Sequence, residues 1–136
     1  KDIYAKAYID EGGFDSTDTQ LQSVEMDDQL SLTPEFPYNW MYDGSRPQMP
    51  GFEMEITCKS LFLIFKDSGE MDVGKADVFV NDVYCMTADP HKNNWLHCNA
   101  VLLFWETESR SHKVRITVTE EDRNKKFTIL GFGYTI

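Results

Sequence analysis

From residue 52 onward the chain consists of short runs of β-branched and aromatic residues separated by turn residues. In one of these runs Val114, Ile116 and Val118 alternate with polar residues, which is the period-two pattern of a strand with one buried face. Short strands at this spacing are typical of an antiparallel sandwich or barrel. We expect seven strands, over residues 52–57, 61–66, 76–80, 83–87, 100–105, 113–119 and 127–134.

The connections between these runs are predicted from turn chemistry. Asn81 and Asp82 tolerate the positive φ angles of a two-residue turn, so residues 76–87 are expected to form a hairpin. Residues 10–18 are rich in Gly and Asp and indicate a loop, and four prolines keep residues 33–51 from being regular.

The first 35 residues are harder to assign. A short helix is expected over residues 2–9, where Ile3, Tyr4, Ala7 and Tyr8 can share a face. Further on, apolar residues at positions 21, 24 and 30 among Ser and Gln indicate at least one strand. Residues 1–35 are therefore either the first strands of the sandwich or a linker from another domain.

The chain has 136 residues, which suits one domain with a single core. We expect an all-β fold: a jelly-roll-like antiparallel β-sandwich spanning residues 1–136. The sequence begins at Lys1 without an initiator Met, so we expect a piece of a longer protein.

The charge balance narrows the classes of partner. Thirteen basic and 23 acidic side chains give a formal net charge of -10, which repels phosphate backbones and anionic lipid. No apolar run approaches the roughly 20 residues of a membrane span. We expect neither a nucleic-acid nor a membrane partner.

The chain has three cysteines, Cys58, Cys85 and Cys98, without CxxC spacing. An odd number argues against a disulfide framework and favours a reducing compartment such as the bacterial cytoplasm.

Motifs for catalysis and metal binding are absent from the sequence. It has no Gly-x-Ser-x-Gly elbow, no HExxH and no Cys/His zinc spacing. We therefore expect no catalytic residues, no metal and no cofactor. The alternative of a structural calcium ion rests on acidic residues in the 10–18 loop, which are more often simply solvated: Asp10, Glu11, Asp15 and Asp18.

Aromatic residues outside the expected strands are the best indication of a binding surface. Trp95 lies in a polar segment with His91, Asn93 and Asn94, and Trp40 and Tyr42 lie in the proline-rich connection. Exposed rings stack on the apolar faces of sugars while amides and imidazoles bond the hydroxyls. We expect carbohydrate binding on the Trp95 loop. Trp40 and Tyr42 are further candidates, but for Trp40, which lies in an apolar cluster, core packing is favoured over binding.

Four segments carry a resemblance to a known family: FPYNWMYDG (36–44), SLFLIFK (60–66), GKADVFVND (74–82) and FTILGFGY (127–134). Together they resemble the β-sandwich domain attached to bacterial SGNH (GDSL-like) esterases, over about three quarters of the chain. The resemblance implies a carbohydrate-binding accessory domain beside an esterase that deacetylates plant polysaccharides. The esterase's Gly-Asp-Ser and Asp-x-x-His blocks are absent here, so no catalytic residue carries over.

Three functional hypotheses follow. The first is a module that binds or positions acetylated glycan for an SGNH-type esterase domain of the same parent chain. The second is a purely structural or oligomerisation domain packed against that esterase. The third, which the motifs favour least, is a complete small hydrolase.

Overall fold

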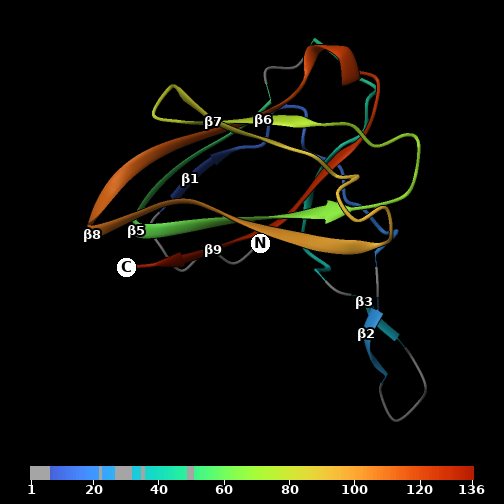
Figure 1. Cartoon of the computed structure of the whole chain (residues 1–136), viewed down its shortest axis with the longest axis horizontal. Coiled ribbons are helices and arrows are strands. Elements are labelled where there is room, and N and C mark those ends of the chain that lie inside the picture. Colours follow the sequence, from blue (N-terminus) through green and yellow to red (C-terminus); the bar gives the residue numbers. More distant parts are fainter. Residues whose placement is uncertain (1–6, 22, 27–31, 35, 49–50) are drawn as a thin grey trace.

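The computed structural model describes residues 7–21, 23–26, 32–34, 36–48 and 51–136. These residues form one antiparallel seven-stranded sheet in the order β4-β9-β5-β8-β6-β7, with β1 also paired to β5. A separate two-stranded ribbon, β2-β3, extends away from the rest (Figure 1). The strands are β1 Ala7–Asp10, β2 Ser23–Met26, β3 Leu32–Pro34, β4 Trp40–Tyr42, β5 Phe52–Asp67, β6 Ala76–Val80, β7 Val83–Ala88, β8 His97–Val118 and β9 Phe127–Thr135, and a 3-10 turn, η1, covers Glu120–Asp122.

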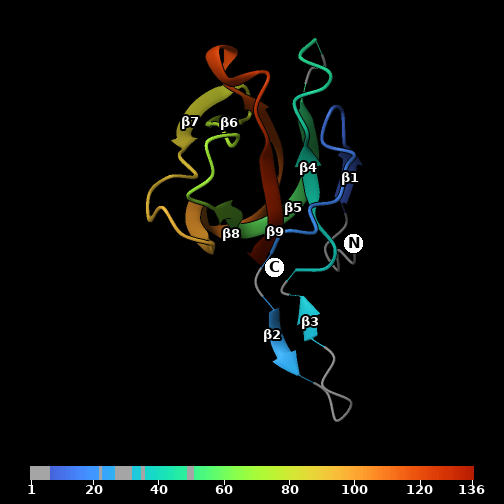
Figure 2. The ribbon, with the colours of Figure 1, turned by 90° about the vertical axis from the view of Figure 1, so that its right-hand side faces the viewer.

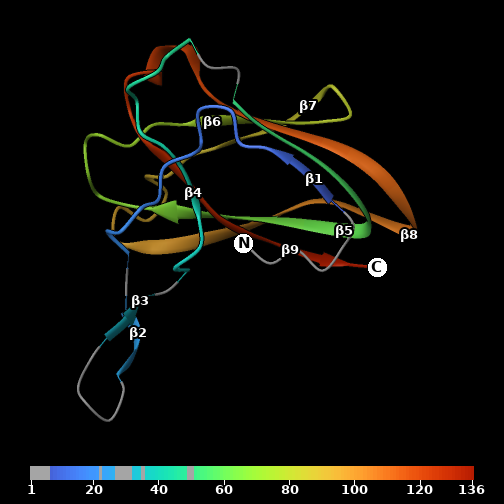
Figure 3. The same cartoon turned by 180° about the vertical axis from the view of Figure 1, so that it is seen from behind.

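Two long strands, β5 and β8, fold this sheet onto itself. They pair along most of their length, from Phe52↔Ile116 to Asp67↔His97, and both reverse direction at the same end of the molecule (Figure 1). Seen from the side, β6 and β7 lie on one flank, β4 and β1 on the other, and β5, β8 and β9 between them (Figure 2). The view from behind shows β1 and β4 in front of the long strands (Figure 3). The two halves of one sheet thus form the layers of the sandwich.

The core lies between these layers and follows the alternation of the strands. In the first half of β5 the even-numbered residues from Phe52 to Cys58 point inward, and in the second half Leu61, Leu63 and Phe65 do so. From β8 the inward side chains are Val114, Ile116 and Val118, as the sequence pattern predicted. Phe14 fills one end of the core, 5.6 Å from the Tyr42 ring and edge-on to Phe52 and Phe127.

The all-β antiparallel fold is confirmed, and so is the hairpin at Asn81-Asp82, whose φ angles are 50° and 64°. The finer expectation of a jelly roll stays a prediction. The strand expected from the apolar residues at 21, 24 and 30 is confirmed by β2, Ser23–Met26.

Several boundaries differ from the expectations. The expected helix is wrong at residues 7–9, because Ala7–Asp10 forms β1 against β5; residues 2–6 lie outside the described residues. The expected strands 52–57 and 61–66 are parts of one strand, β5, and 100–105 and 113–118 are parts of another, β8. Residue 119 lies outside β8. The short strand β4 lies in a connection expected to be irregular, since Trp40, Met41 and Tyr42 pair with β9.

A buried ion pair ties the loop after β1 to the sheet. Asp18 is 7% exposed, and its Oδ2 accepts hydrogen bonds from Lys66 Nζ at 3.0 Å and Thr128 Oγ1 at 2.6 Å. The Asn39 side chain, fully buried, bonds both the amide and the carbonyl of Asp18. Asp18 therefore joins three distant segments of the chain.

Replacing Asp18 by Ala is expected to lower the free energy of unfolding by about 3 to 5 kcal/mol, because the Lys66 ammonium is left buried without a partner. The matched control is Asp15→Ala, which removes the exposed ion pair with Arg46 and is expected to cost less than about 1 kcal/mol. Urea denaturation of both variants measures the difference. Equal midpoints would show that the buried pair does not hold the loop.

The three cysteines do not form disulfides: Cys58 is buried, Cys85 is exposed and Cys98 is partly buried. Burial raises the pKa of the Cys58 thiol, and the Glu106 carboxylate adds to the shift. Because the thiolate is the reactive form, Cys58 should react slowly for two reasons, poor access and a high pKa.

Titration with a thiol reagent after denaturation without reductant is expected to find three thiols. In the native protein at neutral pH, Cys85 should react well before Cys58, as followed by mass spectrometry of labelled peptides. A single titratable thiol after denaturation would reveal a disulfide and contradict this arrangement.

Candidate functional site

The segment expected to bind carbohydrate is a loop between β7 and β8, residues 89–96, next to the end of β5. Two contacts attach it to the chain that follows β5. The Ser68 amide donates to the Pro90 carbonyl at 2.9 Å, and His91 Nε2 lies 2.8 Å from the Glu70 carbonyl oxygen. His91 therefore donates from Nε2 and anchors the loop.

Asp67, the last residue of β5, holds the middle of the loop. Its side chain is fully buried, and both carboxylate oxygens accept from the Asn93 amide N–H at 3.1 and 3.2 Å. Asn99 Nδ2 donates to Asp67 Oδ2 at 2.7 Å, and Asn93 Nδ2 donates to Asn99 Oδ1 at 3.1 Å. The Asn93 side chain thus organises the loop, and Asp67 and Asn99 are site residues that the sequence did not indicate.

Trp95 is the exposed ring of the loop. Its side chain is 57% exposed, and its ring is stacked on His97 with centroids 4.9 Å apart and planes 1° from parallel. Asn94, also exposed, has a φ of 58°, the left-handed conformation that Asn tolerates. The outer face of the Trp95 ring, backed by the His97 ring, is a flat apolar surface beside an exposed amide, a combination that can stack on a sugar face and bond its hydroxyls.

Trp40 and Tyr42, the other two candidate residues, lie in the core rather than in this loop. Trp40 is 4% exposed; its Nε1 donates to Glu11 Oε1 at 3.2 Å and its ring packs on Phe52 and Phe132. Tyr42 is 3% exposed and donates its hydroxyl to the Arg123 carbonyl. Burial raises the pKa of Tyr42, so this hydroxyl keeps its proton. Packed in this way, the Tyr42 ring has no face open to a ligand, and Trp40 contributes only the small part of its ring that lines the groove described next.

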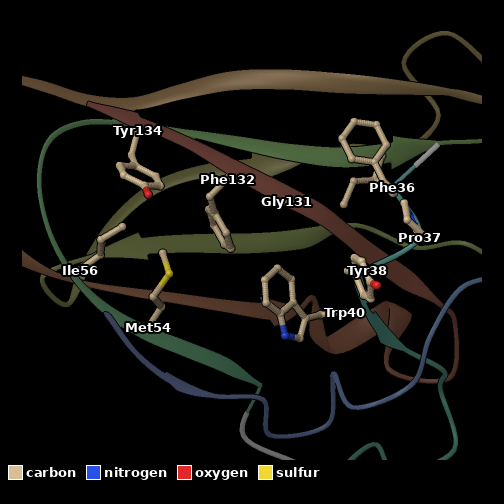
Figure 4. A pocket seen from close by; sticks show the side chains of 10 residues that line it. Phe36, Pro37, Tyr38, Trp40, Met54, Ile56, Gly131, Phe132 and Tyr134 are labelled. Atoms are coloured by element: carbon tan, nitrogen blue, oxygen red, sulfur yellow. The ribbon is translucent and has the colours of Figure 1, made fainter. Parts of the chain in front are cut away.

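A groove lies at the open edge of the sandwich, where the first half of β5 and β9 diverge. It has a volume of about 310 Å³ and is lined by rings and aliphatic chains (Figure 4). The aromatic residues at positions 36–42, which are close together in the sequence, form one wall of the groove. The other walls come from distant strands, and the sequence did not predict them. The lining residues are Phe36, Pro37, Tyr38, Trp40, Met54, Ile56, Leu130, Gly131, Phe132 and Tyr134.

The acidic residues considered for calcium have separate partners. Asp10 accepts from the Gly12 amide and Glu11 from Trp40, while Asp15 pairs with Arg46 and Asp18 with Lys66. Among the described residues, no group of three or more His, Cys, Asp or Glu side chains is arranged to hold a metal ion. Nor does any helix within the described ranges have the length and apolarity to cross a membrane.

Comparison with known proteins gives structural similarity only. No protein-family model and no curated protein matches the chain. Among solved structures, the chain is similar to a two-domain esterase active on acetylated mannans, co-crystallized with mannopentaose, with a TM-score of 0.57 and 15% identity over 96% of this chain and 34% of that chain. A second structure of such an esterase gives a TM-score of 0.55 at 15% identity, over 96% of this chain and 36% of that one.

A family two carbohydrate esterase from Cellvibrio japonicus also matches, with a TM-score of 0.43 and 14% identity over 97% of this chain and 36% of that chain. This chain therefore spans about a third of the length of each of these proteins. At such identities the likeness to the two mannan esterase structures establishes the all-β fold.

The positions of two tryptophans predict opposite effects on stability. Trp95→Ala is expected to change the free energy of unfolding by no more than about 1 kcal/mol, because surface substitutions rarely do more. Trp40→Ala removes a packed ring and is expected to cost roughly 3 to 5 kcal/mol. Denaturant midpoints of the two variants provide the measurement, and a large loss for Trp95→Ala would mean that its ring is part of the core.

Proposed function

We propose that this chain is a non-catalytic module that binds or positions acetylated glycan for an SGNH-type esterase domain in the same parent protein. The observation that carries the proposal is the exposed, parallel Trp95–His97 pair on a loop anchored by a buried carboxylate. The fold similarity to two-domain esterases, of which the chain spans about a third, supports the placement of such a module beside an esterase domain.

The geometry suits binding without chemistry. The Trp95 face supplies apolar contact area to one side of a sugar ring, while the exposed side chains of Lys92 and Asn94 are available for its hydroxyls. The bonds from Asp67 to Asn93 and Asn99 hold the loop before ligand arrives, which reduces the ordering cost of binding. A neighbouring esterase domain would gain by the increased local concentration of substrate.

Isothermal titration with mannan and xylan oligosaccharides tests this function. We expect saturable heat with at least one glycan, weakened about tenfold or more by Trp95→Ala, which corresponds to about 1.4 kcal/mol. The matched control is Trp105→Ala, since Trp105 is 79% exposed but lies on β8 outside the loop. No saturable heat with any glycan, or equal losses in both variants, would contradict the proposal.

A second candidate is a purely structural or oligomerisation domain. The outer face of the second half of β5 favours it, because Phe62 and Leu102 pair there with 41% and 52% exposure. Gly133, opposite Phe62 in β9, leaves this apolar face flat. Sedimentation velocity separates the candidates: an assembly dispersed by Leu102→Glu, together with no glycan binding, would support the structural role.

A further inference from the structure

The groove at the edge of the sandwich is chemically different from the Trp95 loop. Its floor is made by buried residues, Met54, Ile56 and Trp40, and its walls by the partly exposed rings of Phe132 and Tyr134 (Figure 4). At about 310 Å³ it lies at the lower end of the range of small-molecule pockets.

The lining selects the class of ligand. None of the ten lining residues is charged, although the chain as a whole carries a formal net charge of -10. A charged ligand would lose hydration there without gaining a counter-charge. Among the ten described lining residues, the side-chain oxygens are the hydroxyls of Tyr38 and Tyr134, so these residues leave most hydroxyls of a buried sugar without partners.

The rim of the groove is held in a fixed and strained form. Phe36 has a φ of 53°, which is rare for a bulky residue, and its carbonyl accepts a bond from Asn39 Nδ2 at 3.0 Å. Asn39 is fully buried and is itself bonded to the Asp18 backbone. Such strain persists only where the surroundings impose it, and it is concentrated at ligand-binding and active sites.

The wall of the groove is fixed as well. Phe132 stacks on Phe52 with centroids 5.7 Å apart, and Trp40 packs against both rings while its Nε1 donates to Glu11. A flat ligand would therefore meet rings already in place and would pay little ordering cost.

From this geometry we infer that the groove binds a small uncharged aromatic molecule, with its ring among those of Trp40, Phe132 and Tyr134 and its edge against Tyr38. Aromatic ligands gain from offset and edge-to-face packing with such rings and need few hydrogen bonds. This site is separate from the glycan loop and does not rest on glycan binding.

The test uses 2-naphthol as the probe, followed by ligand-observed NMR and calorimetry on the full chain. We expect saturable binding at one site, and binding at least about tenfold weaker for 2-naphthalenesulfonate, which has the same ring and a negative charge that the uncharged lining cannot balance. Failure of 2-naphthol to saturate, or equal affinity for the sulfonate, would overturn the inference.

Two tyrosine variants locate the site. Tyr38→Ala removes a 69% exposed rim residue and is expected to weaken 2-naphthol binding about fivefold or more without unfolding the chain. Tyr84→Ala removes a ring of similar exposure, 58%, on β7 outside the groove and should leave binding unchanged. Equal losses in both variants, or displacement of 2-naphthol by a mannan oligosaccharide, would contradict a separate aromatic site.

Discussion

Both layers of the sandwich depend on the shared reversal of β5 and β8, because every other strand of the main sheet except β4 and β7 pairs directly with one of these two. At the reversal β5 takes the inner path: the pairs Cys58↔Arg110 and Ser60↔Trp105 leave one residue of β5, Lys59, opposite the four residues 106–109 of β8. The outer strand must cover more distance, and the extra residues supply it. The polar residues 106–111 are therefore a bend within a strand.

Across the bend, the Phe104 and His112 rings lie 4.2 Å apart. Glu106 Oε1 lies 3.0 Å from His112 Nε2, at ion-pair distance but without hydrogen-bond alignment.

The same reversal also positions the two candidate binding sites, the β7–β8 loop and the groove. At the opposite end of the long strands, the last residue of β5, Asp67, pairs with the first residue of β8, His97. The β7–β8 loop runs directly into β8 and is also bonded to Asp67, so both long strands hold it. β1 pairs with the first half of β5 and β9 with the second half, and the groove opens where β9 and the first half of β5 diverge. The polar loop and the apolar groove are thus different consequences of one folded sheet. Their chemistry assigns them different ligands.

Much of the fold was predictable from alternation and turn residues, and the failures have physical causes. The β6 strand and its Asn81-Asp82 turn follow directly from β-branched residues and the tolerance of Asn and Asp for positive φ. The sequence predicts two strands in place of β5 because its buried residues change from even to odd positions between Ser60 and Leu61, and such a change of phase looks like the end of a strand. The exposure of Trp95 followed from its polar neighbours. The role of Asp67 could not be foreseen, because a buried carboxylate that accepts amide bonds from a loop 26 residues away leaves no local pattern.

The net charge of the protein restricts the ligands of both candidate sites in the same way. A formal net charge of -10 disfavours anionic ligands over the whole surface, and the described loop and groove offer no cluster of cations that would reverse this locally. The loop presents one lysine, Lys92, and the groove none. Neutral ligands do not suffer this penalty, and sugars and aromatic rings are two neutral classes that stack on Trp and Tyr. What separates the two sites is the supply of hydrogen bonds. The exposed side chains of Lys92 and Asn94 lie close to Trp95 in sequence, whereas Trp40 has its own N–H bonded to Glu11 and lies among mainly apolar groups. Under the two proposals, the same side chain type would therefore serve a polar ligand at one site and an apolar ligand at the other, because the neighbouring groups decide which desolvation cost is compensated.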